Sequence, residues 1–343
     1  MNSARRTLEL SMARKRGIWA AAQDASRFSE LYNLLWGLDI LAPRAADLVK
    51  QALAGRGPAA ACLLLIDPTA FRHRFVWRLF WALSQASLDI SDPGLTATHE
   101  PELNGAFIGM IQRAIASFRT PRRSHDLAVV IGDHATLGNE ARSGADFGLI
   151  IEIDIGDKLL YLVTLLQAKR ATSRIVDVRR AAGDSTQRDR LLGSGIGSYL
   201  FYIAHDDPRH LGPTVKSAEA IGDPQRVDTI VGASDFAARM AAAAGQLAIG
   251  KSGPPYALPG FGAASSREDA AYLLFNPNIP DIRVNNVLVA RIGDITREAL
   301  SIAGFESDWN EVIARHREAV EQARGETGGM GTHEREPPLL SEY

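Results

Sequence analysis

Residues 140–170 read EARSGADFGLIIEIDIGDKLLYLVTLLQAKR. Two apolar runs within this stretch, 147–153 and 159–167, are rich in the branched aliphatic residues that favour β-strands. The residues between them, Ile-Gly-Asp-Lys at 155–158, have the composition of a hairpin turn. The stretch therefore predicts a β-hairpin of two buried strands.

Three polar residues lie near one end of this expected hairpin. Asp146 comes directly before the first strand, and Gln167 and Lys169 are two positions apart at the end of the second. Residues two apart in a strand point to the same face of the sheet. The 23 positions from Asp146 to Lys169 (169 − 146) are enough for the chain to follow one strand, turn and return. We therefore expect the three side chains to converge.

This combination of groups suits the hydrolysis of phosphodiester bonds. A carboxylate and a side-chain carbonyl are ligands that a hard divalent cation such as Mg²⁺ or Mn²⁺ prefers, and the backbone carbonyl of Ala168 lies between them in sequence. The cation would polarise the scissile phosphate and lower the pKa of a bound water. Lys169 would add positive charge beside the transition state. Glu140, six residues before Asp146, is the candidate for a further metal ligand.

GADF at 144–147 followed by QAKR at 167–170 resembles the PD-(D/E)XK nuclease superfamily, in the variant whose second acidic residue is glutamine. The resemblance covers residues 140–202, and a helix expected at 102–118 would match the first helix of the family's core. It implies an α/β fold with a restriction-endonuclease-like core, in which helices flank a mixed central sheet. It also implies metal-dependent cleavage of DNA, in prokaryotic restriction or antiphage defence.

The resemblance assigns roles to individual residues. Asp146 and Gln167 would bind the catalytic metal, Lys169 would assist the attacking water, and a glutamate from the helical part before the hairpin would complete the site, for which Glu140 is the candidate. Gln167 carries no charge, so metal affinity should fall unless Glu140 or Glu152 contributes. Glu152 lies an even number of positions from Asp146 and hence on the same face, although a charge on the solvent-facing side of the sheet is the favoured interpretation.

Two other functions remain open from the sequence. The missing charge at Gln167 leaves room for a catalytically weak or inactive nuclease-fold subunit that binds DNA or a protein partner. A nucleotide-binding α/β protein built around the glycines at 193–197 is a further alternative, although these glycines follow an expected helix, whereas a dinucleotide loop lies between a strand and a helix.

Composition is typical of a globular protein of 343 residues, with 46% hydrophobic and 23% charged residues. The net charge of −2 indicates that DNA would be held by local patches, and it fits an enzyme whose activity a protein partner or a homo-oligomer controls. Residues expected to contact the phosphate backbone are Arg122, Arg123, Arg170, Arg179, Arg180 and Gln187. A single cysteine, Cys62, and the lack of a signal or membrane-spanning segment predict a cytoplasmic protein with no membrane association.

The chain is expected to divide into four regions. These are a mainly helical region at 1–92, the nuclease-like core at 93–215, a C-terminal α/β and helical region that packs on the core at 216–323, and a disordered tail at 324–343. Helices are expected at 71–83, 102–118, 235–248 and 295–321, and further strands at 127–131, 198–204, 229–231 and 282–292. The helix at 71–83 should bury Phe75, Leu79 and Trp81, the alternative being a basic and aromatic surface for nucleic acid.

Overall fold

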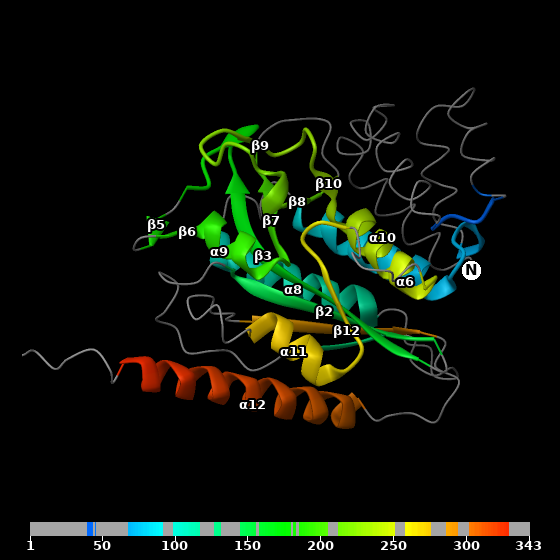
Figure 1. Cartoon of the computed structure of the whole chain (residues 1–343). Coiled ribbons are helices and arrows are strands. Elements are labelled where there is room, and N and C mark those ends of the chain that lie inside the picture. Colours follow the sequence, from blue (N-terminus) through cyan, green and yellow to red (C-terminus); the bar gives the residue numbers. More distant parts are fainter. Residues whose placement is uncertain are drawn as a thin grey trace, which may run out of the picture.

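A mixed β-sheet forms the centre of the molecule, and helices cover both of its faces (Figure 1). The computed structural model describes residues 40–43, 45, 68–91, 99–116, 127–131, 145–155, 158–179, 181–182, 185–204, 212–250, 258–275, 286–293 and 302–328. Within them, the α/β class and the mixed sheet flanked by helices are confirmed.

The sheet combines strands from distant parts of the chain. In spatial order these are β1 (Leu127–Ile131), β12 (Asn286–Gly293), β2 (Phe147–Asp154), β3 (Leu159–Ala171), β7 (Gly197–Ile203), β8 (Thr214–Ser217) and β10 (Ser234–Asp235), with β11 (Gly262–Ala264) pairing the first half of β3. β2 and β3 are antiparallel, whereas β12 pairs with β2 and β7 pairs with β3 in parallel. Parallel neighbours on both sides of a hairpin require long connections, and helices provide them.

The expected hairpin is present as β2 and β3. Phe147 lies opposite Leu166 and Asp154 lies opposite Leu159, so the two strands stay in register over the whole of β2. β3 continues to Ala171, beyond the end at residue 167 that the apolar run predicts. Its last residues pair with β7, which extends the strand past the end of the hairpin. Lys169 therefore lies within a strand and not in a loop.

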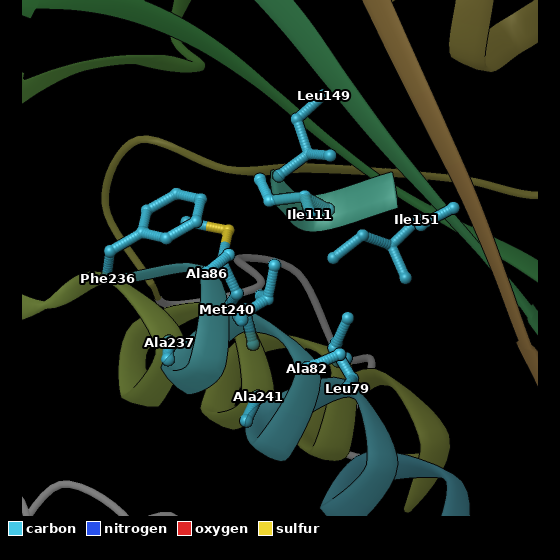
Figure 2. Close-up of a cluster of buried hydrophobic side chains, with 14 of the residues drawn as sticks. Leu79, Ala82, Ala86, Ile111, Leu149, Ile151, Phe236, Ala237, Met240 and Ala241 are labelled. Carbon is cyan, nitrogen blue, oxygen red and sulfur yellow. The ribbon is translucent and has the colours of Figure 1, made fainter. Parts of the chain in front are cut away.

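One face of the sheet is covered by α6 (Arg74–Ile90), α8 (Glu100–Ala116) and α10 (Phe236–Ala248). Figure 2 shows the side chains that these helices and β2 bury together, among them Leu79, Ala82, Ala86, Ile111, Leu149, Ile151, Phe236, Ala237, Met240 and Ala241. Small alanine side chains let α6 and α10 approach closely. Phe75, Leu79 and Trp81 are all buried, so the expected core helix is confirmed, and these aromatic rings form no surface for nucleic acid.

The opposite face is covered by α9 (Gln187–Ser194), α11 (Arg267–Phe275) and α12 (Ile302–Gly328). α11 packs so closely on β2 that a Cβ atom at Gly148 would overlap the side chain of Leu274. The sequence analysis did not anticipate α11, because its apolar residues are too few to give a clear helical period.

The sheet joins regions that the sequence analysis had divided. β12 follows the expected boundary at 215/216 by some seventy residues, yet it lies between β1 and β2, second from one edge of the sheet. The helix α6 of the expected N-terminal region shares a layer with α10. The disordered tail expected at 324–343 is wrong at its start, because residues 324–328 belong to α12; the rest of the tail lies outside the described residues.

The strand expected at 229–231 is wrong. β9 (Val227–Asp228) pairs with β4 (Ile175–Val176) and ends before that segment. The Asp228 carboxylate then accepts hydrogen bonds from the backbone amides of Ile230 and Val231, at 2.9 and 2.8 Å. An aspartate that caps its own following amides stabilises a turn, and here this local bond outweighs the strand preference of the branched side chains. A second short hairpin joins β5 (Ala181–Ala182) to β6 (Ser185–Thr186).

Glu152 lies fully buried in β2 and takes part in a charged network. Its carboxylate pairs with the guanidinium groups of Arg267 and Arg291, each at 3.3 Å, and accepts a hydrogen bond from the Trp309 indole at 3.1 Å. Both expectations for this residue are therefore wrong: it neither lines the cleft of Asp146 nor faces solvent. α11 and α12 cover this face, and each brings a partner for the carboxylate.

Removing Glu152 should destabilise the protein strongly, because the buried Trp309 indole would lose its acceptor and the buried Arg291 would keep only Asp154 as its counter-charge. For Glu152→Ala we expect the free energy of unfolding to fall by about 3–5 kcal/mol in urea titrations. The matched control is Glu268→Ala, which removes the exposed partner of Arg315 and should change the value by less than about 0.5 kcal/mol. Equal, small effects of both substitutions would contradict a structural role for the network.

Candidate functional site

Three elements bring polar side chains together at the C-terminal end of β3. Asp146 directly precedes β2, Gln167 and Lys169 lie in the last part of β3, and Glu100 is the first residue of α8. The convergence of Asp146 with Gln167 and Lys169 agrees with the prediction from the hairpin, while Glu100 is an addition. We refer to these four side chains as the β3-end site.

Asp146 is fixed by hydrogen bonds to the strand beside it. Its Oδ2 accepts from the Gln167 side-chain amide at 2.7 Å and from the Ala168 backbone amide at 2.8 Å, and its own backbone amide donates to the carbonyl of Leu166. This last bond continues the β2–β3 ladder by one step. The carboxylate therefore has a single well-defined position at the end of the hairpin.

Glu100 reaches β3 from the first turn of α8. One carboxylate oxygen lies 3.3 Å from the Lys169 ammonium, and the other accepts a hydrogen bond from the backbone amide of Arg170 at 3.2 Å. The sequence analysis began this helix at residue 102 and so missed Glu100. Pro101 is the signal that was available, because proline is favoured in the first turn of a helix and places Glu100 at its start. Glu140, the glutamate proposed in its place, lies outside the described residues.

Gln187 extends the site behind Gln167. It is the first residue of α9, its side chain is buried, and its Nε2 donates to Oε1 of Gln167 at 2.7 Å. A contact from Gln187 to the phosphate backbone was expected from the sequence; this is corrected, because the side chain points into the protein. The prediction failed because nothing in the sequence indicated that the first turn of α9 packs on β3.

The electrostatics of the site centre on Asp146. Burial, the largest effect, and the neighbouring carboxylate of Glu100 raise the pKa of Asp146, while Lys169 and the hydrogen bonds lower it; the result is a pKa of about 6, against an ordinary value of 3.8. Because Lys169 and Glu100 both act on Asp146, the charged groups share one site. The carboxylate is thus under-compensated, which favours the uptake of a proton or a cation.

Tyr202 of β7 lies close to both carboxylates. Burial raises the pKa of its hydroxyl far above the ordinary value, and the charges of Asp146 and Glu100 raise it further. Its ring packs edge-on against Phe107, with 5.7 Å between ring centroids. Within the described part of the chain the hydroxyl has no hydrogen-bond partner, although buried polar groups are normally paired. The sequence analysis did not single out Tyr202, because its apolar strand predicted only a core position.

The donor atoms of the site fit a hard divalent cation. They are the carboxylate oxygens of Asp146 and Glu100 and the carbonyl oxygen of Ala168, all of the type that Mg²⁺ and Mn²⁺ prefer. The side-chain oxygen of Gln167 is of the same type, but it accepts from Gln187, and the amide nitrogen of Gln167 faces Asp146. The raised pKa of Asp146 supports this fit, since a cation would supply the missing compensation. No group of three or more His, Cys, Asp or Glu side chains that could hold a metal occurs among the described residues, so the site depends on its neutral oxygens.

The expected phosphate-binding arginines are placed only in part. Arg170 is exposed and follows Lys169 directly, at the mouth of the site. Arg179 is exposed, but its guanidinium binds the carboxylate of Asp177 and lowers the pKa of that group. The remaining arginines of this prediction, Arg122, Arg123 and Arg180, lie outside the described residues.

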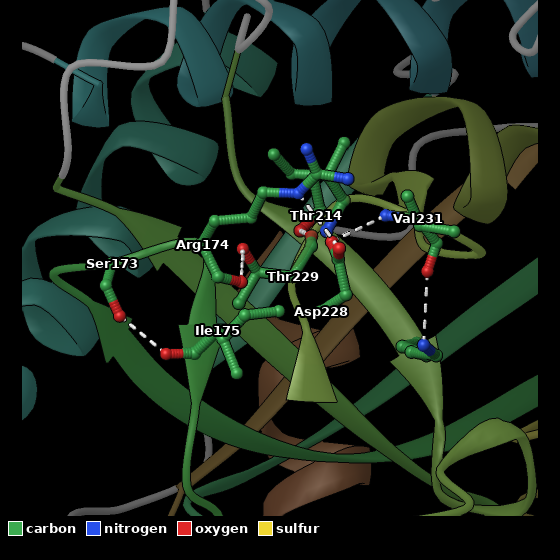
Figure 3. Close-up of polar contacts among 9 residues, drawn as sticks. Ser173, Arg174, Ile175, Thr214, Asp228, Thr229 and Val231 are labelled. Carbon is green, nitrogen blue, oxygen red and sulfur yellow. Dashed lines mark hydrogen bonds and ion pairs between the residues drawn. The ribbon is translucent and has the colours of Figure 1, made fainter. Parts of the chain in front are cut away.

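A polar segment that is linked to β8 by several hydrogen bonds follows β3. The Arg174 guanidinium binds Asp228 at 2.9 Å, the Thr229 hydroxyl donates to the carbonyl of Arg174, and the Thr214 hydroxyl donates to the carbonyl of Thr229 (Figure 3). Lys216 donates from the adjoining strand to the carbonyl of Val231. These bonds tie β4 and β9 to β8.

The glycines at 193–197 link the end of α9 to β7, with Gly195 at a φ of +70°. Loops that cradle phosphate run the other way, from a strand into a helix N-terminus. The geometry therefore does not favour the nucleotide-binding alternative.

Comparison of the chain with protein-family models, with curated proteins and with solved structures found no match. Of the helices in the described residues, none has both the length and the apolar character that crossing a membrane requires.

Replacing Asp146 by asparagine should stabilise the metal-free protein at neutral pH. The raised pKa means that ionising Asp146 opposes folding as the pH rises from about 4 to 6, and the full penalty is present above pH 6. Asparagine keeps an oxygen that can accept from Gln167 and Ala168. For Asp146→Asn in EDTA we expect a gain of up to about 3 kcal/mol at pH 7.5, as judged from the shift of 3.8 to about 6, and none near pH 4.

Urea titrations of both proteins across this pH range provide the measurement. A difference in stability that does not vary with pH would show that the carboxylate of Asp146 is not under-compensated.

Proposed function

We propose that this chain is a metal-dependent nuclease that hydrolyses phosphodiester bonds of DNA, with a restriction-endonuclease-like core. The observation that carries the proposal is the meeting of Asp146, Gln167 and Lys169 with Glu100 at one end of β3. These groups come from a hairpin and from a helix that starts 69 positions before Lys169. Of these, Asp146, Gln167 and Lys169 also carry the sequence resemblance to PD-(D/E)XK nucleases.

Asp146 and Glu100 would hold the cation with negative charge, and Gln167 and Ala168 would complete its shell with neutral oxygens. When bound, the cation would supply Lewis-acid polarisation of the phosphate and activation of water. Asp146 is already fixed by the amide of Ala168. The protein therefore offers a preformed carboxylate whose burial strengthens its interaction with a cation.

Lys169 would stabilise the negative charge that develops as water attacks the phosphorus. Its side chain is only 13% exposed, so its ammonium interacts through a medium of low dielectric constant. The ion pair with Glu100 holds the ammonium beside the carboxylates. Without this charge, the scissile phosphate would approach two carboxylates that repel it.

DNA as the substrate, and a role in restriction or antiphage defence, follow from the resemblance. Arg170 at the mouth of the site is the phosphate contact that its exposed position supports. A net charge of −2 implies that few such contacts act, and that a protein partner or a second copy of the chain adds to them.

One observation supports the alternative of a subunit that binds but does not cut. The Gln167 amide nitrogen, and not its oxygen, faces Asp146. A site held in this state would bind metal weakly and retain only the fold of a nuclease.

Cleavage of plasmid DNA in Mg²⁺, in Mn²⁺ and in EDTA separates the two functions. We expect divalent-dependent cleavage that falls by about 10²-fold or more in Lys169→Ala, because the charge beside the transition state is lost. The matched control is Lys158→Ala at the opposite end of β3, which should cleave at the unchanged rate. No cleavage with any metal, from folded protein, would favour the binding subunit.

The glutamate of the site is tested by comparing Glu100→Gln with Glu140→Gln. Glu100→Gln should reduce cleavage by about 10²-fold through loss of a charged metal ligand, and raising the Mn²⁺ concentration should restore part of it. Glu140→Gln should cleave at close to the original rate. The reverse result would return the role to Glu140, the residue that the sequence analysis favoured.

A further inference from the structure

Gln187, Gln167 and Asp146 form a chain of hydrogen bonds with a single direction. Nε2 of Gln187 donates to Oε1 of Gln167, and Nε2 of Gln167 donates to Oδ2 of Asp146, each at 2.7 Å. Both glutamines are buried, Gln167 at 1% exposure and Gln187 at 8%, so bulk water does not compete for these bonds. This series of hydrogen bonds runs from Gln187 on α9 to the carboxylate of Asp146 in the β3-end site.

In this direction the two hydrogen bonds compensate part of the charge of Asp146 in the absence of a cation. The amide nitrogen of Gln167 carries partial positive charge and lies where a metal ligand would have to present an oxygen. A cation on Asp146 would be repelled by that N–H group. Gln167 therefore cannot serve as a metal ligand while its amide points this way.

The opposite direction would occupy the same volume, but without a cation it would place Oε1 of Gln167 against Oδ2 of Asp146 and the carbonyl of Ala168, which now accept from Nε2. The oxygen and nitrogen ends of an amide are nearly the same size, so each amide can reverse within the volume it occupies. Gln167 would then present its oxygen beside Asp146 and donate to an oxygen of Gln187. If only Gln167 reversed, its amide nitrogen would face that of Gln187, so the two amides must reverse together.

We propose that Gln187 is a positioning residue that determines which end of Gln167 faces the cation, and that the two amides reverse together when a divalent cation binds. This inference rests on the proposed function and deepens it. The buried amide of Gln187 would orient the oxygen of Gln167 toward the cation. This explains how a neutral residue serves at a position where relatives of the expected type use a carboxylate.

Binding of Mn²⁺ to the full chain without DNA, followed by the electron paramagnetic resonance of free Mn²⁺, tests the inference. Gln187→Met keeps the length of the side chain but neither donates nor accepts. We expect Gln187→Met to weaken Mn²⁺ binding by about 10-fold or more, in the range typical when the partner of a metal ligand is lost.

Gln167→Glu supplies the matched background, because a carboxylate presents an oxygen to the cation in either orientation and needs no partner to orient it. In that background Gln187→Met should no longer weaken Mn²⁺ binding. A residue that only supports the fold would cause the same loss in both backgrounds, and this result would overturn the inference. So would unchanged binding in Gln187→Met alone.

A second measurement needs no substitution and so does not depend on the folding of a variant. Titration with Mg²⁺ should shift the side-chain amide signals of both Gln167 and Gln187 in ¹⁵N nuclear magnetic resonance spectra. Gln85, whose amide donates to Asp89 on α6, is the control and should not shift. Shifts at Gln167 without shifts at Gln187 would exclude a joint reversal.

The proposed function and this inference fail in different ways. Absence of Mn²⁺ binding and of cleavage in the unchanged protein would overturn both. Binding and cleavage that Gln187→Met leaves intact would overturn the inference alone.

Discussion

The register between β2 and β3 is the constraint on which the candidate site depends. Phe147 lies opposite Leu166, and this pairing places Asp146 beside Gln167 and Ala168. A slip of one residue would turn Gln167 to the other face of the sheet and separate it from the carboxylate. The apolar side chains that both strands bury on the two faces oppose such a slip. The relative positions of the site residues therefore depend on the packing of the core.

Two carboxylates on neighbouring parts of this hairpin have opposite electrostatic situations. Glu152 is surrounded by Arg267 and Arg291, and it joins the sheet to α11 and α12. Asp146 has Lys169, but it also has the carboxylate of Glu100 close by, and burial leaves its pKa raised. The first arrangement contributes to the cohesion of the fold. The second retains an unbalanced charge, which is the condition for binding a ligand of opposite sign.

The sequence predicted those parts of the site that a local pattern determines. Asp146 and Gln167 were found together because an alternating hairpin fixes which side chains meet at its end. Glu100 and Gln187 were not predicted to join them, because these residues lie on helices whose placement depends on packing against the whole sheet. Glu152 shows the same limit, because the helices that bury it and supply its partners come more than a hundred positions later in the chain.

The position of β12 between β1 and β2 has a consequence for folding during synthesis. β12 pairs with both β1 and β2, yet 132 positions separate its start from the end of β2 (286 − 154). At about 5–20 residues per second, a ribosome would deliver β12 roughly 7 to 25 s after β2. During that interval β1 and β2 would present open edges, which are prone to wrong pairing. This part of the sheet therefore cannot be completed until synthesis has passed residue 293.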